Sequence, residues 1–201
     1  MARREEILDA ATELFAEHGY SDAVTQALAE RLQVGKGTLY RYFPSKRDLF
    51  LAAADRVMRR MRERIDDVIA GVDDPLDRVV EAIRSFLAFF AEHPEFVELL
   101  IQERALFKDR TQPTYVQHRD KNVTRWREHY RTLIADGRIR NIPVERISDV
   151  IGDLLYGTIF TNYFTGRRKS TETQARDILD ILFEGILSDS ERRRRDPAGA
   201  G

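Results

Sequence analysis

The most informative stretch of the chain is residues 35–50, which read GKGTLYRYFPSKRDLF. Its first half predicts a short helix over residues 36–42, because Leu39 and Phe43 lie one turn apart and Pro44 cannot continue a helix. Those two apolar side chains are expected to face a core. The other side of the short helix is therefore free to face a partner.

Basic residues are concentrated around this stretch. From Arg31 to Arg47 the chain carries five basic residues, no acid, and interleaved aromatic residues. The net charge of the whole chain is only −1, but a nucleic-acid footprint needs basic groups on one surface only. The alternative interpretation is a solvated basic face. Ser45 then predicts an N-cap, with Asp48 three residues on, for a long helix that ends near Ala70.

Two short helices joined by a tight turn suit DNA, because one helix fits the major groove while the other braces it. The bracing helix is predicted at 24–32, the turn at 33–35 and the recognition helix at 36–42. Gly37 lets the helix start approach the sugar-phosphate chain closely. The predicted phosphate contacts are Lys36, Tyr42 and Lys46. The predicted contacts to base edges or methyl groups are Thr25, Gln26, Thr38 and Tyr40.

Helical periodicity dominates the chain, and no strand or repeat stands out, so the predicted fold is all-α. A first helix begins near Ile7 and ends at Gly19. After the long helix, further helices are predicted at 75–92, 94–107, 113–135, 143–165 and 171–188, the last with a capping box of Thr171 and Gln174. The predicted domains are a helix-turn-helix DNA-binding domain (1–47), a second helical domain (48–190) and a disordered tail (191–201).

Composition disfavours other classes of protein. The 201 residues include no cysteine, so disulfides and thiolate metal sites are excluded. The four histidines are scattered, and neither a metal-binding helical pair nor a phosphate-binding glycine loop is present. We therefore expect no enzyme, cofactor, metal or membrane span, and a cytoplasmic location. The rival interpretations are an enzyme and a helical adaptor that dimerises without DNA; the adaptor leaves the basic segment 35–47 without a purpose.

Residues 35–50 resemble the signature of the TetR family of bacterial repressors, and the helix from Ile7 to Gly19 is similar too. The resemblance covers residues 3 to about 55, and beyond that only the general plan. It implies a homodimer whose last two helices pair with those of a second copy, and an effector cavity under the long connecting helix. It also implies a repressor that binds a near-palindromic double-stranded DNA operator and is released by a small-molecule effector. The effector, the operator sequence, the regulated genes and repression versus activation stay open.

The chain departs from the family pattern at several positions. Ala23 and Val24 stand where two threonines usually open the second helix, so Ser21 or Asp22 is expected to cap it and one phosphate contact is expected to be missing. Gln33 replaces the usual turn glycine, and Gly35 replaces a serine.

The predicted effector site consists of polar and aromatic residues on otherwise apolar helix faces. The candidates are Glu103, Arg104, Trp126, Tyr130, Asp153 and Phe160. Glu103 falls in the middle of an apolar arc, where a buried carboxylate needs a partner. The alternatives are an internal ion pair, a helix turned to place Glu103 in water, and aromatic residues that are plain core. With a cavity, Glu103 and Asp153 would suit a lipophilic cation.

The predicted dimer contact involves the last two helices. Residues 143–165 are apolar on nearly every side, which suits a helix buried between its own core and a second copy. Residues 171–188 place Ile178, Leu182 and Ile186 on one face. Homodimerisation through 143–165 and 171–188 is therefore expected.

Overall fold

The computed structural model describes residues 2–167 and 169–185, and within them every regular element is a helix, as predicted. The helices are α1 (Ala2–Asp22), α2 (Thr25–Arg31), α3 (Lys36–Tyr42), α4 (Lys46–Ala70), α5 (Pro75–Glu92), α6 (Pro94–Leu106), α7 (Thr114–Ala135), α8 (Val144–Thr165) and α9 (Thr171–Glu184). The chain forms two compact units, residues 1–168 with α1 to α8 and residues 169–201 with α9. The predicted tail, 191–201, lies outside the described residues.

Helix α1 breaks near its end. Gly19 has a φ of +70° and a ψ of −179°, a non-helical conformation that glycine adopts more easily than other residues, and a short continuation then runs to Asp22. A Cβ atom at position 19 would lie 2.6 Å from Nε2 of Gln102 on α6, so a larger residue there would displace the end of that side chain. The Tyr20 amide donates a hydrogen bond of 2.7 Å to Oε1 of Gln102. The end of α1 is therefore held against α6.

The caps explain where α2, α3 and α4 begin. Gly35 is the N-cap of α3, and Ser45 caps α4, as predicted, by accepting a 3.0 Å hydrogen bond from the Asp48 amide. The expected capping of α2 by Ser21 or Asp22 is wrong, because Val24 is the N-cap and makes no side-chain hydrogen bond. Gln33 occupies the turn with a φ of +52°, in the left-handed region where glycine is easiest to accommodate.

The later helix ends differ slightly from the prediction. Ser170 caps α9 by accepting a 3.2 Å hydrogen bond from the Thr173 amide, so the predicted box of Thr171 and Gln174 is wrong. Helix α9 ends at Glu184 rather than at residue 188, because Gly185 with a φ of +74° is its C-cap. Ser170 and Thr171 are both good caps and neighbours in sequence, so the pattern alone favoured the wrong one.

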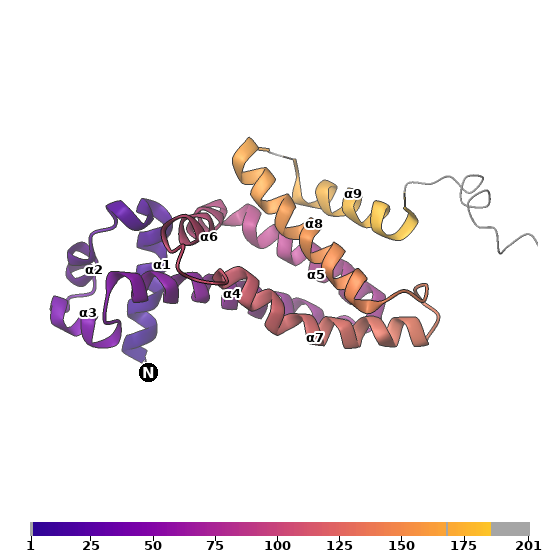
Figure 1. The fold of residues 1–201 in the computed structure, drawn as a ribbon, viewed down its shortest axis with the longest axis horizontal. Coiled ribbons are helices and arrows are strands. Elements are labelled where there is room, and N and C mark those ends of the chain that lie inside the picture. The colour runs from indigo at the N-terminus through magenta and orange to yellow at the C-terminus, as the bar shows by residue number, and fades with distance from the viewer. Residues whose placement is uncertain (1, 168, 186–201) are drawn as a thin grey trace, which may run out of the picture. The chain divides into compact units, whose positions relative to one another are not determined.

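Helix α4 is the centre of the first unit. It contacts α1, α5, α6 and α7, while α8 contacts α5, α6 and α7. Figure 1 shows α4 extending from the group of α1, α2 and α3 to the layer formed with α5 and α7. Near its start, the Phe50 ring packs edge-on against the rings of Phe15, Tyr20 and Phe107, with centroids 5.0, 5.2 and 5.6 Å away. One rigid element thus joins the N-terminal helices to the bundle.

Within the described residues, no helix combines the length and the apolar character that a membrane span requires.

Candidate DNA interface and effector pocket

Helix α3 has the two faces that its sequence predicted. Leu39 and Phe43 are buried, whereas Lys36, Gly37 and Arg41 are exposed. Thr38, Tyr40 and Tyr42 are half-buried. No atom lies within 4 Å of where a Cβ of Gly37 would be, so the start of α3 is open to a close partner. Its outer face can therefore meet DNA without rearrangement of the core.

Tyr40 links α3 to α2. Its hydroxyl lies 3.1 Å from the hydroxyl of Thr25, which is only 8% exposed. The Lys36 ammonium lies 6.0 Å from the centre of the Tyr40 ring. The structure thus places Thr25 as a brace behind Tyr40, while Gln26 is exposed and its amide nitrogen donates a 2.9 Å hydrogen bond to Glu30.

The basic residues of this region differ in whether a carboxylate neutralises them. Arg31 pairs with Glu13 at 2.7 Å, and Arg47 pairs with Asp109. Lys46 donates a 3.1 Å hydrogen bond to the Ser21 carbonyl, and the structure records no carboxylate partner for it within the described residues. Its ammonium also lies 4.8 Å from the centre of the Tyr20 ring. The charge of Lys46 is therefore available for a phosphate group.

Arg41 is a residue that the site prediction left out. It is exposed, and its guanidinium lies 5.5 Å from the centre of the Tyr42 ring without a carboxylate partner in the described part of the chain. It follows Gly37 by four residues and Thr38 by three, which places it on the same side of the helix. That spacing was the signal that could have added it to the candidate contacts.

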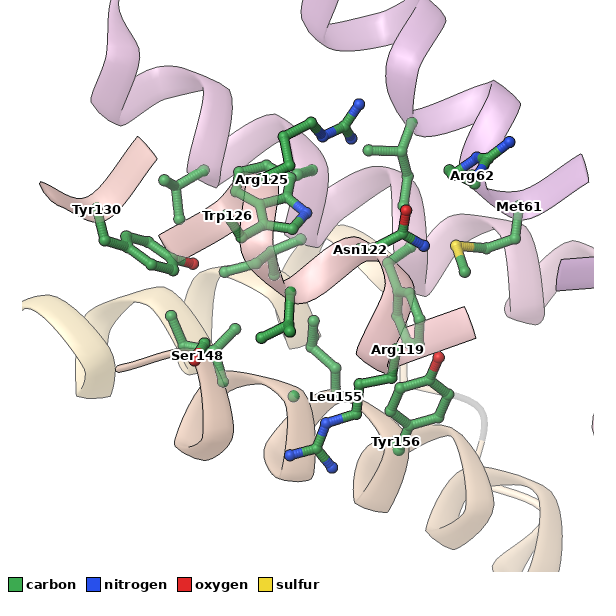
Figure 2. Close-up of a pocket in the computed structure, with 18 residues that line it drawn as sticks. Met61, Arg62, Arg119, Asn122, Arg125, Trp126, Tyr130, Ser148, Leu155 and Tyr156 are labelled. Carbon is green, nitrogen blue, oxygen red and sulfur yellow. The ribbon is translucent and has the colours of Figure 1, made fainter. Parts of the chain in front are cut away.

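A cavity of about 130 Å³ lies between α4, α5, α7 and α8. Figure 2 shows it surrounded by side chains from all four helices. Its lining is mostly apolar: Met61 and Ile65 on α4, Val79, Ala82, Ile83 and Phe86 on α5, Val123 and Trp126 on α7, and Ile151, Leu155 and Tyr156 on α8. A largely apolar cavity with a few polar groups is the usual form of a small-molecule site.

Two tyrosines give the cavity its polar interior. Tyr130 is 5% exposed and Tyr156 is 8% exposed, and neither hydroxyl makes a hydrogen bond with another residue that the structure describes. Burial raises the pKa of both phenols above their usual range, so each stays protonated at neutral pH. Both hydroxyls can therefore donate a hydrogen bond to a molecule in the cavity.

Arginines complete the lining. Arg119 pairs with Asp153 at 2.6 Å, and Arg125 pairs with Asp66 at 2.5 Å. Arg62 also lines the cavity, and the structure records no ion pair for it with the residues described. Figure 2 shows the Arg62 guanidinium at the edge of the group of lining residues.

Glu103 has an internal partner. It is 1% exposed, and its Oε1 accepts hydrogen bonds from the Thr114 amide at 2.8 Å and the Thr114 hydroxyl at 2.9 Å. Arg110 lies 2.8 Å from the same oxygen. Of the alternatives for Glu103, the structure therefore shows the internal ion pair, and Glu103 does not belong to the cavity lining.

The other predicted effector residues divide into two groups. Trp126 and Tyr130 line the cavity, as a shared face of one helix suggested. Arg104 and Asp153 are exposed and do not line it, and Phe160 packs edge-on against Tyr115 with centroids 5.7 Å apart. With both carboxylates outside the cavity, the geometry gives no support to a cationic effector.

Sequence reasoning missed several lining residues, among them Met61, Arg62, Arg119, Asn122, Ser148 and Tyr156. For two of them a signal existed. Asn122 and Arg119 precede Trp126 by four and seven residues, which places all three on one side of a helix. The residues of α4, α5 and α8 gave no such signal, because only the packing of four helices brings them together.

Among the described residues, no group of three or more potential ligands could hold a metal ion.

The chain matches known proteins along nearly all of its length. Residues 7–53 match the family described as "Bacterial regulatory proteins, tetR family", and residues 72–186 match "Tetracyclin repressor-like, C-terminal domain". The HTH-type transcriptional repressor AcnR of Corynebacterium diphtheriae is 30% identical over 195 residues, covering 92% of this chain and 92% of that protein. The HTH-type transcriptional repressor KstR of Rhodococcus jostii is 29% identical over 194 residues, covering 95% of this chain and 85% of that protein.

A solved structure supports the same fold. The transcriptional regulator FadR from Bacillus subtilis, in complex with stearoyl-CoA, superposes with a TM-score of 0.74 at 19% identity, covering 91% of this chain and 99% of that one. Regulators of this family bind DNA operators and small-molecule effectors and act as dimers. The chain therefore belongs to the TetR family and is a DNA-binding transcriptional repressor.

Proposed function

We propose that two copies of the chain bind a near-palindromic operator through α3, and that a small molecule in the cavity between α4, α5, α7 and α8 weakens this binding. The observation that carries the proposal is the position of α4. Phe50 near its start belongs to the core of the N-terminal helices, and Met61 and Arg62 farther along line the cavity. A tilt of this one helix would change the spacing of the two recognition helices, which must match the helical repeat of DNA.

A hydrogen bond between α7 and α4 lies close to the cavity. Nε2 of His118 on α7 lies 2.7 Å from Oδ1 of Asp55 on α4, and this hydrogen bond lowers the pKa of the Asp55 carboxyl. Arg119, the residue after His118, lines the cavity. A ligand that displaces α7 can therefore act on α4 through this pair. The ligand can change the free energy of DNA binding only by the difference between its binding free energies to the conformation that binds DNA and the one that does not. This difference is typically about 1–3 kcal/mol.

For the DNA contacts, we assign Lys36, Gly37, Tyr42 and Lys46 to the phosphates. We assign Gln26, Thr38 and Tyr40 to the bases, with Thr25 holding Tyr40 in place, and we add Arg41 to the phosphate contacts. The exposed side chains of Lys36 and Arg41, and the half-buried Lys46 without a recorded carboxylate partner among the described residues, support this assignment. We divide the chain accordingly into a DNA-binding part, 1–47, and an effector-binding and dimerisation part, 48–190. The protein would act in the cytoplasm.

The experiment that tests the proposal is a selection for DNA sequences that the protein retains from a random pool. Selected sequences with two inverted half-sites about one helical turn apart, 10–10.5 base pairs between centres, are the expected result. Selected sequences with a single half-site, or no enrichment, would contradict the proposal. The relatives are transcriptional regulators and not enzymes, and we propose no catalytic residue, cofactor or metal.

Replacing both Lys36 and Lys46 by alanine is expected to weaken binding to all DNA sequences alike. Each lysine that neutralises a phosphate releases counterions, so the slope of log K against log salt should become shallower by roughly two units at most. Filter binding or fluorescence anisotropy at several salt concentrations measures this slope. Lys121→Ala, an exposed lysine on α7, is the matched control and should leave it unchanged. If the double variant has the same slope as the wild type, neither lysine contacts a phosphate.

We propose that α8 and α9 form the contact between the two copies. The Phe164 side chain of α8 is 69% exposed, and Ile181 and Phe183 of α9 are exposed as well. Leu182 is half-buried, and the predicted contact Ile186 lies outside the described residues. An obligate dimer contact of this kind buries roughly 2,000 Å² or more. Exposed aromatic residues on the two helices favour such a contact.

Phe164→Asp is expected to convert the dimer into a monomer at micromolar concentration, because the new charge would be buried in the contact. Sedimentation velocity measures the change, and circular dichroism shows whether the helices remain. Leu106→Asp replaces an exposed apolar residue on α6 and should leave the dimer intact. A dimeric Phe164→Asp variant would place the contact elsewhere, and a monomeric wild-type protein would refute dimerisation itself.

A further inference from the structure

The polar groups that line the cavity share one property: each can donate a hydrogen bond, and none is a carboxylate. They are Arg62, Arg119, Asn122, Arg125, Trp126, Tyr130, Ser148 and Tyr156. No Asp or Glu belongs to the lining that the structure describes. A cationic ligand would therefore meet no opposite charge, whereas a ligand with acceptor oxygens would meet donors on three helices.

The two tyrosine hydroxyls indicate a ligand that carries oxygen atoms as hydrogen-bond acceptors. Buried phenols usually find a hydrogen-bond partner. Within the residues described the structure records none for Tyr130 or Tyr156, and both hydroxyl oxygens remain accessible although the side chains are buried. In Figure 2 the Tyr130 hydroxyl is directed toward the middle of the lining residues. A ketone, ester or carboxyl oxygen in the cavity would supply the missing acceptor.

The charge balance at the cavity points to an anion. Asp153 and Asp66 compensate Arg119 and Arg125, which leaves Arg62 as a cavity arginine without an ion pair in the described part of the chain. Met61, its neighbour on α4, contributes to the apolar wall. An apolar molecule in the cavity would pack against Met61, and a negative group at its edge would pair with Arg62.

We propose that the effector is a compact amphipathic anion whose apolar body fills the cavity, whose oxygen atoms accept hydrogen bonds from Tyr130 or Tyr156, and whose negative charge lies at Arg62. The assignment rests on the proposed role of this cavity as the effector site. The cavity volume of about 130 Å³ limits the apolar body to a short chain or a small ring system. An apolar protein cavity of roughly 150 Å³ holds a benzene molecule, which sets the scale.

Trp126 provides a direct measurement of binding. It is the one tryptophan of the chain, and it lines the cavity. Its fluorescence can therefore follow titrations with octanoate, 1-octanol and octylammonium, which share one hydrocarbon chain and differ in head group. Octanoate should bind about tenfold more tightly than 1-octanol, as one additional charge-assisted contact allows, and octylammonium should bind most weakly.

Two variants separate the contribution of the Arg62 charge to ligand affinity from that of the Tyr130 hydroxyl. Arg62→Gln should reduce the affinity for octanoate to that for 1-octanol and leave 1-octanol binding unchanged, which also shows that the variant is folded. Tyr130→Phe should weaken both ligands severalfold. Arg104→Gln, an exposed arginine outside the cavity, is the matched control and should bind like the wild type. Should Arg62→Gln fail to fold, the wild-type protein still provides a test, because salt should weaken octanoate binding and not 1-octanol binding.

The proposal is overturned if octylammonium binds as tightly as octanoate, if Arg62→Gln binds octanoate like the wild type, or if none of the three ligands changes the Trp126 emission. These outcomes concern the ligand class and leave DNA binding untouched. Conversely, octanoate could bind as expected and yet leave operator binding unchanged. That result would support the proposed ligand class and refute the regulatory role of the cavity.

Discussion

Replacing Glu103 by glutamine is expected to lower the free energy of unfolding by about 3 kcal/mol, because the Arg110 charge then loses its buried partner. For a chain of this size, that loss corresponds to a fall in Tm of roughly 6–12 °C. The Glu103 carboxylate accepts from both Thr114 donors and lies 2.8 Å from Arg110. Glutamine can still accept from Thr114 but cannot balance the guanidinium.

Thermal unfolding followed by circular dichroism measures the effect. Glu128→Gln removes an exposed carboxylate whose partner is Arg131 on the same helix, so it is the matched control and should change stability by less than about 0.5 kcal/mol. Octanoate binding should be unaffected in Glu103→Gln at a temperature where it is folded, since Glu103 does not line the cavity. An unchanged Tm together with a weakened ligand response would instead restore Glu103 as an effector contact.

Tyr40→Ala is expected to abolish specific operator binding while the protein keeps its helicity and its dimeric state. A direct base contact contributes about 1–3 kcal/mol of discrimination. The proposed dimer carries two copies of Tyr40, so the loss should reach about 2–6 kcal/mol, or roughly 30-fold to 10⁴-fold in affinity. Fluorescence anisotropy with operator and with unrelated DNA measures specific and non-specific binding separately.

Two milder variants show which part of Tyr40 matters. Tyr40→Phe keeps the ring and removes the hydroxyl, whereas Thr25→Val keeps Tyr40 and removes the hydroxyl 3.1 Å away. Equal losses of operator affinity in the two variants would indicate that the hydroxyl pair positions the Tyr40 ring. A loss confined to Tyr40→Phe would indicate that the hydroxyl contacts the DNA. If Tyr40→Ala unfolds, Tyr40 belongs to the core and its assignment to the outer face is wrong.

Local signals predicted the bounds of α3 and the start of α4 well. Helix α3 begins and ends at the predicted residues because Gly35, Pro44 and the apolar spacing of Leu39 and Phe43 all act within a few residues. The Ser45 cap was equally predictable, since its partner Asp48 is three residues away. The hydroxyl pair of Thr25 and Tyr40 was not, because it depends on how two helices cross.

The effector half was predictable in outline only. Periodicity identified the helices and placed Trp126 and Tyr130 on one face, but it could not show which faces of four helices would enclose a cavity. Glu103 illustrates the limit. The sequence showed that it needs a partner, yet Arg110 and Thr114 follow the end of α6, in and just after a non-helical segment. Helical spacing gives no direction for side chains there.

The close contact between Gly19 and Gln102 has an evolutionary consequence. A side chain at position 19 would displace the end of Gln102, and the φ of +70° would strain it whatever residue stands at position 102. Position 19 is therefore expected to stay glycine among relatives, whatever residue stands at position 102. A chimaeric regulator that joins the first 47 residues of this chain to another effector half would have to keep Gln102, and with it Phe107, whose ring packs 5.2 Å from that of Tyr20. A graft cut after residue 47 would therefore separate Tyr20 from Gln102 and Phe107, which it contacts in this chain.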